Sequence, residues 1–195
     1  LAVQSIVESI GKTSTIYYGG EIPYTQNSVM MNVLNISTVK LEIDEEESIQ
    51  NIKNAIVNSL IVVIDTSCCF GKENNVSLSP FIDKNIKADI VIDHHLINPY
   101  LECSCYINRQ YGSCSTIMYE ILKAANISIN KGLATALYLG ISTDTVDLKS
   151  EGTVENDKVA LDSLRSVIDV ELLIQIYDYP KPLALLELRK RVYNN

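Results

Sequence analysis

The chain has 195 residues, of which 47% are hydrophobic, and its formal net charge is −8. This length predicts one domain with a sizeable core, and no apolar run approaches the roughly 20 residues that a membrane-spanning helix needs. The acidic balance argues against a broad basic face for duplex nucleic acid. A small phosphate-bearing substrate stays compatible with it, because bound divalent metal ions would invert the local charge.

In chain order, short β-rich runs alternate with helical stretches up to about residue 107. The patterns predict strands where β-branched and apolar residues cluster and helices where apolar residues recur at helical spacing. Gly11 is the predicted stop of the first helix. The predicted strands cover 13–18, 39–43, 60–64, 90–92 and 103–107, and the predicted helices cover 1–10, 29–34 and 48–59.

From Gly112 onward the pattern is helical. Ser113 or Ser115 is the predicted cap of a helix that runs to Ala125, and Asn130 is the predicted cap of the next. Further helices are predicted from Thr153, over 169–176 and over 183–193.

Alternation of strands and helices predicts an α/β fold with a mainly parallel sheet and helices on both faces. We expect one core domain over residues 1–178. We expect residues 179–195 to form a C-terminal helix that links to a further domain.

The five cysteines predict reduced thiols in a cytoplasmic protein. Their number is odd and no two have the C-x-x-C spacing. Cys103 and Cys105 would share one face of a strand, but a zinc site there would need two more soft ligands.

Acids and histidines follow three predicted elements. Asp65 ends one apolar run, Asp93-His94-His95 ends another and holds the only two histidines of the chain, and Asp144 closes a helical pattern. Ligands of parallel sheets bind beyond the carboxyl ends of the strands, and carboxylates with imidazoles are typical ligands of divalent metals. Taken singly, Asp65 and Asp144 are ordinary turn or loop residues. The three positions together predict a metal site.

These residues resemble the DHH phosphoesterase superfamily. The likeness lies in Ile-Val-Ile-Asp-His-His at 90–95, preceded by Val-Val-Ile-Asp-Thr at 62–66 and followed by Gly-Ile-Ser-Thr-Asp-Thr at 140–145. The superfamily includes RecJ-type exonucleases, oligoribonucleases that also act on phosphoadenosine phosphate, cyclic-dinucleotide phosphodiesterases and family II inorganic pyrophosphatases.

The resemblance implies a site for two manganese ions, with magnesium as an option. Asp65 would bridge both ions, and His94 and Asp144 would bind one of them. His95 would face the substrate phosphate and Asp93 would orient the site, so these two are the implied catalytic residues. For substrate binding we name Arg109, Ser113 and Ser115, although Arg109 has an ordinary surface role as its alternative.

The chain departs from the family pattern in two places. The family's first motif, a His before an Asp-x-Asp-Ala stretch, would precede Leu1, and the Gly-rich motif of a second domain is missing from the sequence. We therefore expect a core domain that lacks this first motif. As the sequence stands, we expect weak or no activity and one metal ion or none.

The leading hypothesis is metal-dependent hydrolysis of phosphodiester or phosphomonoester bonds in small nucleotides or short single-stranded oligonucleotides. Two alternatives are a family II-type inorganic pyrophosphatase and a non-catalytic nucleotide-binding regulatory domain. The sequence predicts no membrane partner and leaves the oligomeric state open, a homodimer included.

Overall fold

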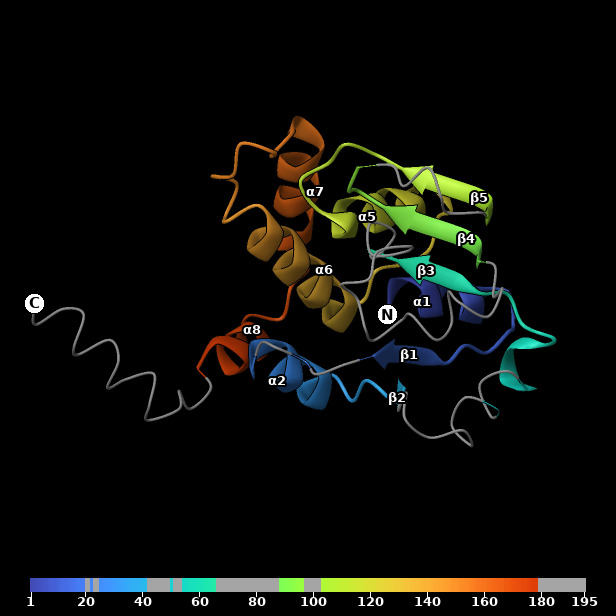
Figure 1. Ribbon diagram of the computed structural model, residues 1–195. Coiled ribbons are helices and arrows are strands. Elements are labelled where there is room, and N and C mark those ends of the chain that lie inside the picture. Colours follow the sequence, from blue (N-terminus) through green and yellow to red (C-terminus); the bar gives the residue numbers. More distant parts are fainter. Residues whose placement is uncertain are drawn as a thin grey trace, which may run out of the picture.

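The structure is a computed structural model that describes residues 1–19, 22, 25–41, 50, 54–65, 88–96 and 103–178. All strands in this part of the chain pair in parallel, in one sheet of two strands and one of three with the order β3-β4-β5. Figure 1 shows the β1-β2 pair beyond β3. The strands are β1 (Ile16–Gly19), β2 (Thr38–Leu41), β3 (Val62–Ile64), β4 (Ala88–Asp93) and β5 (Cys103–Asn108).

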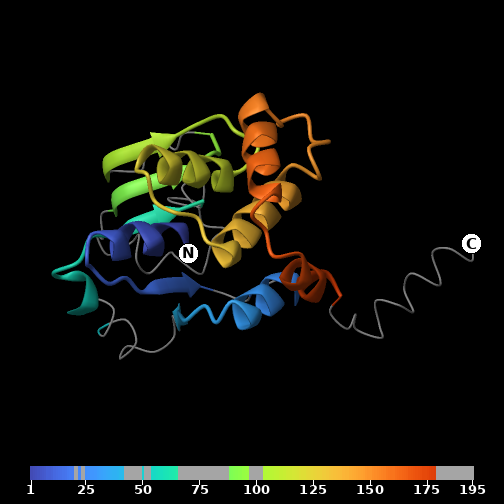
Figure 2. The same cartoon turned by 180° about the vertical axis from the view of Figure 1, so that it is seen from behind.

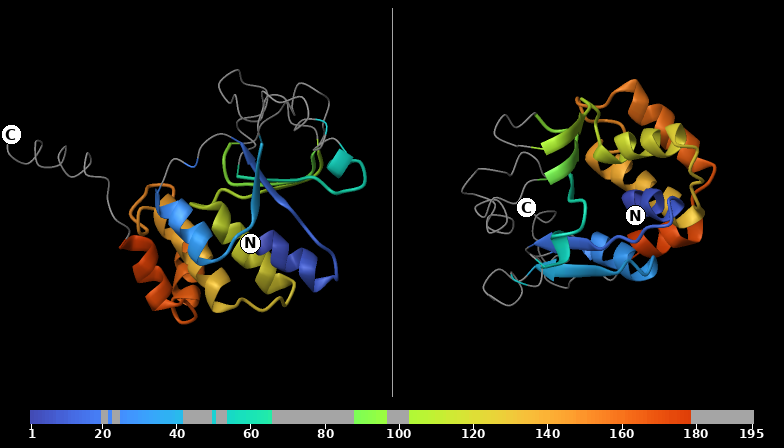
Figure 3. Two further views of the ribbon diagram at one scale, coloured as in Figure 1. Left: turned by 90° about the horizontal axis from the view of Figure 1, so that it is seen from below. Right: turned by 90° about the vertical axis from the view of Figure 1, so that its right-hand side faces the viewer.

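The helices of the described part pack behind the strands. Figures 2 and 3 show α1, α5 and α6 together on one side of the three-stranded sheet. The helices are α1 (Ala2–Ser9), α2 (Thr25–Val33), α5 (Cys114–Ala124), α6 (Lys131–Asp144), α7 (Glu155–Arg165) and α8 (Val170–Tyr177). The predicted α/β class, with parallel strands flanked by helices, is confirmed. Helices on the second face of the sheet stay a prediction.

The hydrophobic core lies between the sheet and these helices. Ile92 of β4 is nearly inaccessible, and so are Leu122 of α5, Ile141 of α6 and Leu164 of α7, which belong to the same cluster. Burial of such side chains contributes roughly 1.5–3 kcal/mol each. The core therefore fixes where β4 ends and where α5 and α6 lie against it.

Local capping signals set several helix ends as expected. Ser113 caps α5, where its hydroxyl accepts from the backbone N–H of Ser115, and the Asn130 side chain accepts from the N–H of Leu133 at the start of α6. Gly11 has a positive φ of 70° after α1, which glycine adopts without strain. These three predictions are confirmed.

Other boundaries differ by a few residues. The first strand begins at Ile16 rather than at residue 13, and α2 begins at Thr25, four residues before the predicted start. The third helix of the C-terminal half begins at Glu155, because the carboxylate of Asp157 accepts from the N–H of Val154 and closes the turn there. Capping by Asp157 thus places the start two residues beyond Thr153.

Some predictions lie outside the described residues. Of the predicted helix over 48–59, residues 50 and 54–56 are helical, and residues 48–49 and 51–53 lie outside the described part. The segment 179–195, with its predicted helix, is outside as well, so the domain division stays a prediction. Cys103, Cys105 and Cys114 are free thiols, and Cys68 and Cys69 are not among the described residues. No helix of the described part is long and apolar enough to cross a membrane.

Candidate metal centre

The parallel register of β3 and β4 brings Asp65 and Asp93 to one edge of the sheet. Ile64 pairs with Ile92, and the residue after each is an aspartate. The backbone N–H of Asp65 donates to the carbonyl of Ile92 at 2.9 Å, so Asp65 is held against β4 although its strand has ended. Asp65 has a φ of 60°, a conformation that aspartate tolerates better than most residues. Its carboxylate is half exposed beyond the strand ends.

Asp93 is fully buried and organises the two histidines. Its Oδ1 atom accepts from the backbone N–H groups of His94 and His95, at 2.7 and 3.0 Å, and lies 2.7 Å from Nδ1 of His95. A carboxylate with several N–H partners at one oxygen fixes the backbone that follows it. Asp93 therefore sets the direction in which both imidazoles leave β4.

The two ring nitrogens of His94 face different partners, the backbone carbonyl of Tyr111 and the carboxylate of Asp65. Its Nδ1 lies 3.0 Å from the carbonyl oxygen of Tyr111, and its Nε2 lies 3.2 Å from Oδ1 of Asp65. A carbonyl oxygen only accepts, so Nδ1 carries the hydrogen. The Nε2 atom then faces the carboxylate either with a proton or with its lone pair.

The surroundings of His94 favour a positive charge. The hydrogen bond to Asp65 raises the pKa of His94 from 6.5 to about 9 against the opposing effect of burial, with further contributions from the Tyr111 carbonyl and the charge of Asp144. A site that favours a charge on this ring also favours a cation beside it.

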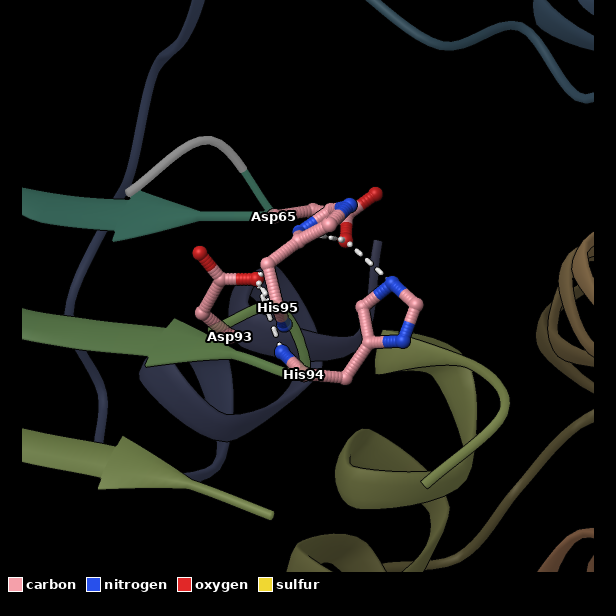
Figure 4. A group of neighbouring side chains, drawn as sticks. All are labelled: Asp65, Asp93, His94 and His95. Atoms are coloured by element: carbon pink, nitrogen blue, oxygen red, sulfur yellow. Dashed lines mark hydrogen bonds and ion pairs between the residues drawn. The ribbon is translucent and has the colours of Figure 1, made fainter. Parts of the chain in front are cut away.

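His95 stands next to His94, and their ring centroids are 4.4 Å apart. Its Nδ1 is engaged by Asp93 and lies 3.8 Å from Oδ1 of Asp65. Figure 4 shows both imidazoles near the Asp65 side chain, beyond the end of β3. The side chain is partly exposed, so a ligand can reach this ring.

Asp144 is the last residue of α6, and its charge acts on His94. It does not belong to the close group formed by Asp65, Asp93, His94 and His95. Burial raises the pKa of its carboxyl above the usual value, and the charge of Asp65 acts in the same direction. The Ser113 hydroxyl and the two histidines lower it in part. A cation bound near Asp144 would offset both of the effects that raise its pKa.

The donor set fits a divalent cation. Asp65, Asp93, His94 and His95 offer ligand atoms that all lie within 4.8 Å of one another. Two ligands at right angles and about 2.1 Å from one octahedral ion lie about 3.0 Å apart. The 3.2 Å between Nε2 of His94 and Oδ1 of Asp65 matches this spacing. Asp93, which is engaged by N–H donors at Oδ1, fits an orienting role better.

The three predicted substrate-binding residues lie in different surroundings. Ser113 is fully buried, where its hydroxyl caps α5 and lowers the pKa of Asp144 in part. Ser115 is partly buried, close to Gly140 of α6. Arg109 is exposed and donates to the carbonyl of Asn108. Their part in substrate binding stays a prediction.

Sequence analysis did not identify the loop that supports the histidines. Asn108 donates from Nδ2 to the carbonyl of His95 at 2.8 Å, and the Tyr111 carbonyl orients His94. Asn108 is the last residue of β5, and Tyr111 lies in the segment that links β5 to α5. The one signal for this segment in the sequence is Gly112, where the pattern becomes helical.

Comparisons with known proteins identify the family of the chain. The model of the "DHH family, N-terminal domain" matches residues 8–141. An uncharacterized protein of Methanocaldococcus jannaschii is 32% identical over 180 residues, which cover 90% of this chain and 33% of that protein. A probable manganese-dependent inorganic pyrophosphatase of Lactobacillus delbrueckii subsp. bulgaricus is 32% identical over 44% of this chain and 28% of its own length.

A solved structure extends the likeness to the fold. An exopolyphosphatase-related protein from Bacteroides fragilis superposes with a TM-score of 0.68 at 19% identity, over all of this chain and 55% of that one. The match of the family over residues 8–141 means that the chain belongs to the DHH family, as its motifs predict. The chain spans about a third of the length of the curated relatives it matches.

Proposed function

We propose that this chain forms the metal-binding part of a divalent-metal-dependent phosphohydrolase. The observation that carries the proposal is the pair formed by Nε2 of His94 and Oδ1 of Asp65, 3.2 Å apart, with the other nitrogen of His94 held by a backbone carbonyl. Metal-bound histidines characteristically donate their second N–H in this way. Asp144 adds a third ligand from the end of α6.

The proposed ligands are Asp65, His94 and Asp144, and the donor set suits manganese, with magnesium as the alternative. Two ions are expected for a complete site. A bound divalent ion would polarise a phosphoryl oxygen and supply a water of lowered pKa for attack on phosphorus.

His95 and Asp93 are not proposed as metal ligands, and their roles concern the substrate and the orientation of the site. Asp93 holds Nδ1 of His95 at 2.7 Å, which fixes the orientation of the ring. We propose that His95 presents its Nε2 atom to a substrate phosphate oxygen, binds it and stabilises the charge that develops there. Loss of His95 should then affect turnover more than metal affinity.

For the substrate we propose a small phosphate compound. A small nucleotide or short oligonucleotide remains the first candidate, as the motifs predict. Inorganic pyrophosphate is the second, and the names of relatives such as that of L. delbrueckii favour it. Both need the same metal site, so the substrate is a separate experimental question.

The test is hydrolysis by the natural protein with manganese, measured as phosphate release from phosphoadenosine phosphate and pyrophosphate and as mononucleotide release from an oligonucleotide. Phosphoadenosine phosphate, a short oligonucleotide and pyrophosphate are supplied in parallel. We expect turnover of one class, at least 100-fold slower in Asp65→Asn and His94→Ala. The matched control is Asp162→Asn on the exposed face of α7, which loses only a surface ion pair with Arg165 and should retain wild-type rates. Equal rates in all four proteins, or no release from any substrate, would contradict the proposal.

A further inference from the structure

A second buried carboxylate, Asp157, lies outside the proposed ligand set and has no part in the chemistry above. It sits in the first turn of α7 and is fully buried. Its Oδ2 accepts from the N–H groups of Gly112 and Val154, both at 2.9 Å, and its Oδ1 accepts from the Thr116 hydroxyl at 2.6 Å. Capping of α7 explains the bond to Val154 but not the one to Gly112.

The Gly112 N–H belongs to the same peptide group as the Tyr111 carbonyl. No peptide bond in the described part of the chain is cis, so this N–H and this carbonyl point in opposite directions. One peptide therefore connects Asp157, 2.9 Å from its nitrogen, with Nδ1 of His94, 3.0 Å from its oxygen. Hydrogen bonds arranged in such a chain in a buried environment polarise one another.

The loop is shaped around this peptide. A Cβ atom at Gly112 would lie 2.7 Å from Oδ2 of Asp157 and 2.7 Å from Cγ2 of Thr145, so only glycine lets the loop approach α7 and the end of α6 so closely. The Gly112 position thus serves the contact with Asp157.

The side chain of Tyr111 is also held by hydrogen bonds, one of which comes from the first turn of α7. Its hydroxyl donates to Glu120 at 3.0 Å, and Asn156 donates to both the Tyr111 hydroxyl and Glu120. Asn156 and Asp157 are neighbours in the first turn of α7, so both anchors of the loop come from one turn.

We propose that Asp157 is a positioning residue for metal binding: it holds and polarises the Tyr111–Gly112 peptide, whose carbonyl keeps Nε2 of His94 directed at Asp65. This inference rests on the proposed function, because it assigns His94 as a metal ligand. A carboxylate that acts on a metal-bound histidine raises the basicity of the ligand. Here the carboxylate acts across a peptide group instead of touching the ring.

The test compares Asp157→Asn with Thr116→Val in the natural protein. Asparagine keeps the shape, can accept from Gly112 and Val154 and can donate to Thr116, but it removes the charge. Valine at 116 removes a buried hydrogen bond to the same carboxylate and leaves the Gly112 contact in place. The readouts are Mn²⁺ affinity by calorimetry, the melting temperature, and the Nδ1–H resonance of His94 in metal-free protein labelled with ¹⁵N-histidine. The resonance that is lost in His94→Gln assigns His94.

We expect Asp157→Asn to weaken Mn²⁺ binding about tenfold or more, the range typical of groups that support metal ligands. The His94 Nδ1–H resonance should move toward that of a weaker hydrogen bond, whereas Thr116→Val should leave affinity and resonance near those of the wild type at a similar cost in melting temperature. Wild-type affinity in Asp157→Asn, or equal weakening in both variants, would overturn this inference alone. If the wild-type protein binds no Mn²⁺, the proposed function fails together with it.

Discussion

The Nδ1 atom of His94 is bound to a backbone carbonyl, and this contact decides what its Nε2 atom can do. With the hydrogen at Nδ1, the opposite nitrogen meets the Asp65 carboxylate either protonated or through a cation. A proton and a metal ion therefore compete for one atom. The two aspartates beside it, Asp65 and Asp93, differ in burial and partners, and we expect them to differ in role.

The first residue-scale prediction concerns the stability of the metal-free protein. The folded-state pKa of His94 is raised from 6.5 to about 9. Its protonation therefore adds stability that is complete below pH 6.5 and is lost as the pH rises through about 9. Denaturant unfolding of wild type and His94→Gln in a chelator, from pH 6 to pH 10, should show a difference in stability that shrinks across this window. A difference that stays constant with pH would contradict the assignment.

The second prediction separates the two aspartates. Asp93→Ala leaves buried N–H donors without their acceptor and should lower the free energy of unfolding by about 2–4 kcal/mol. At pH 10, above the folded-state pKa of about 9 for His94, Asp65→Asn keeps a side chain that tolerates its positive φ and loses no ion pair with that ring, so the metal-free protein should change by less than about 1 kcal/mol. Urea unfolding measures both. Equal losses would mean that Asp65 is structural.

At the scale of elements, the site depends on how closely α5 and α6 approach each other. A Cβ at Gly140 would overlap the hydroxyl of Ser115 and lie 3.0 Å from its Cβ. This contact holds the C-terminal end of α6, which carries Asp144, close to α5.

The element-scale prediction is that Gly140→Ala destabilises the protein by about 1–3 kcal/mol through overpacking, despite the higher helix propensity of alanine. Gly132→Ala in the same helix is the matched control. There the nearest atom is the end of the Leu34 side chain at 3.2 Å, which can rotate away, so the change should be neutral or stabilising. Thermal unfolding of both variants decides. If the two variants have the same change in melting temperature, the close approach at Gly140 does not contribute to stability.

The sequence predicted the elements that follow from local patterns. The apolar runs of β3 and β4 and the capping side chains of Ser113 and Asn130 are local features, and the ends of two adjacent parallel strands meet by geometry. The contacts of Asp157 with Thr116 and Gly112 cross 41 and 45 residues. No periodicity or cap in the sequence encodes such pairs, so the support of His94 emerged only from the structure.

At the scale of the whole molecule, the proposed ligands come from three separate segments on two layers. Asp65 and His94 follow strands, and Asp144 ends a helix, so metal binding would link the sheet to the helical layer. With a net charge of −8, the protein also attracts cations in general. A specific site must therefore be distinguished from diffuse binding by its stoichiometry and its protons.

The most direct test of the metal centre is calorimetric titration of Mn²⁺ into the natural protein under anaerobic conditions, at several pH values and in buffers of different ionisation enthalpy. Below pH 9 we expect saturable binding at fixed stoichiometry that displaces a proton from His94, so affinity rises with pH and levels off near pH 9. His94→Ala should bind at least tenfold more weakly and lose this pH dependence. Weak, non-saturating binding without proton release, unchanged in His94→Ala, would contradict the metal centre and the phosphohydrolase that depends on it.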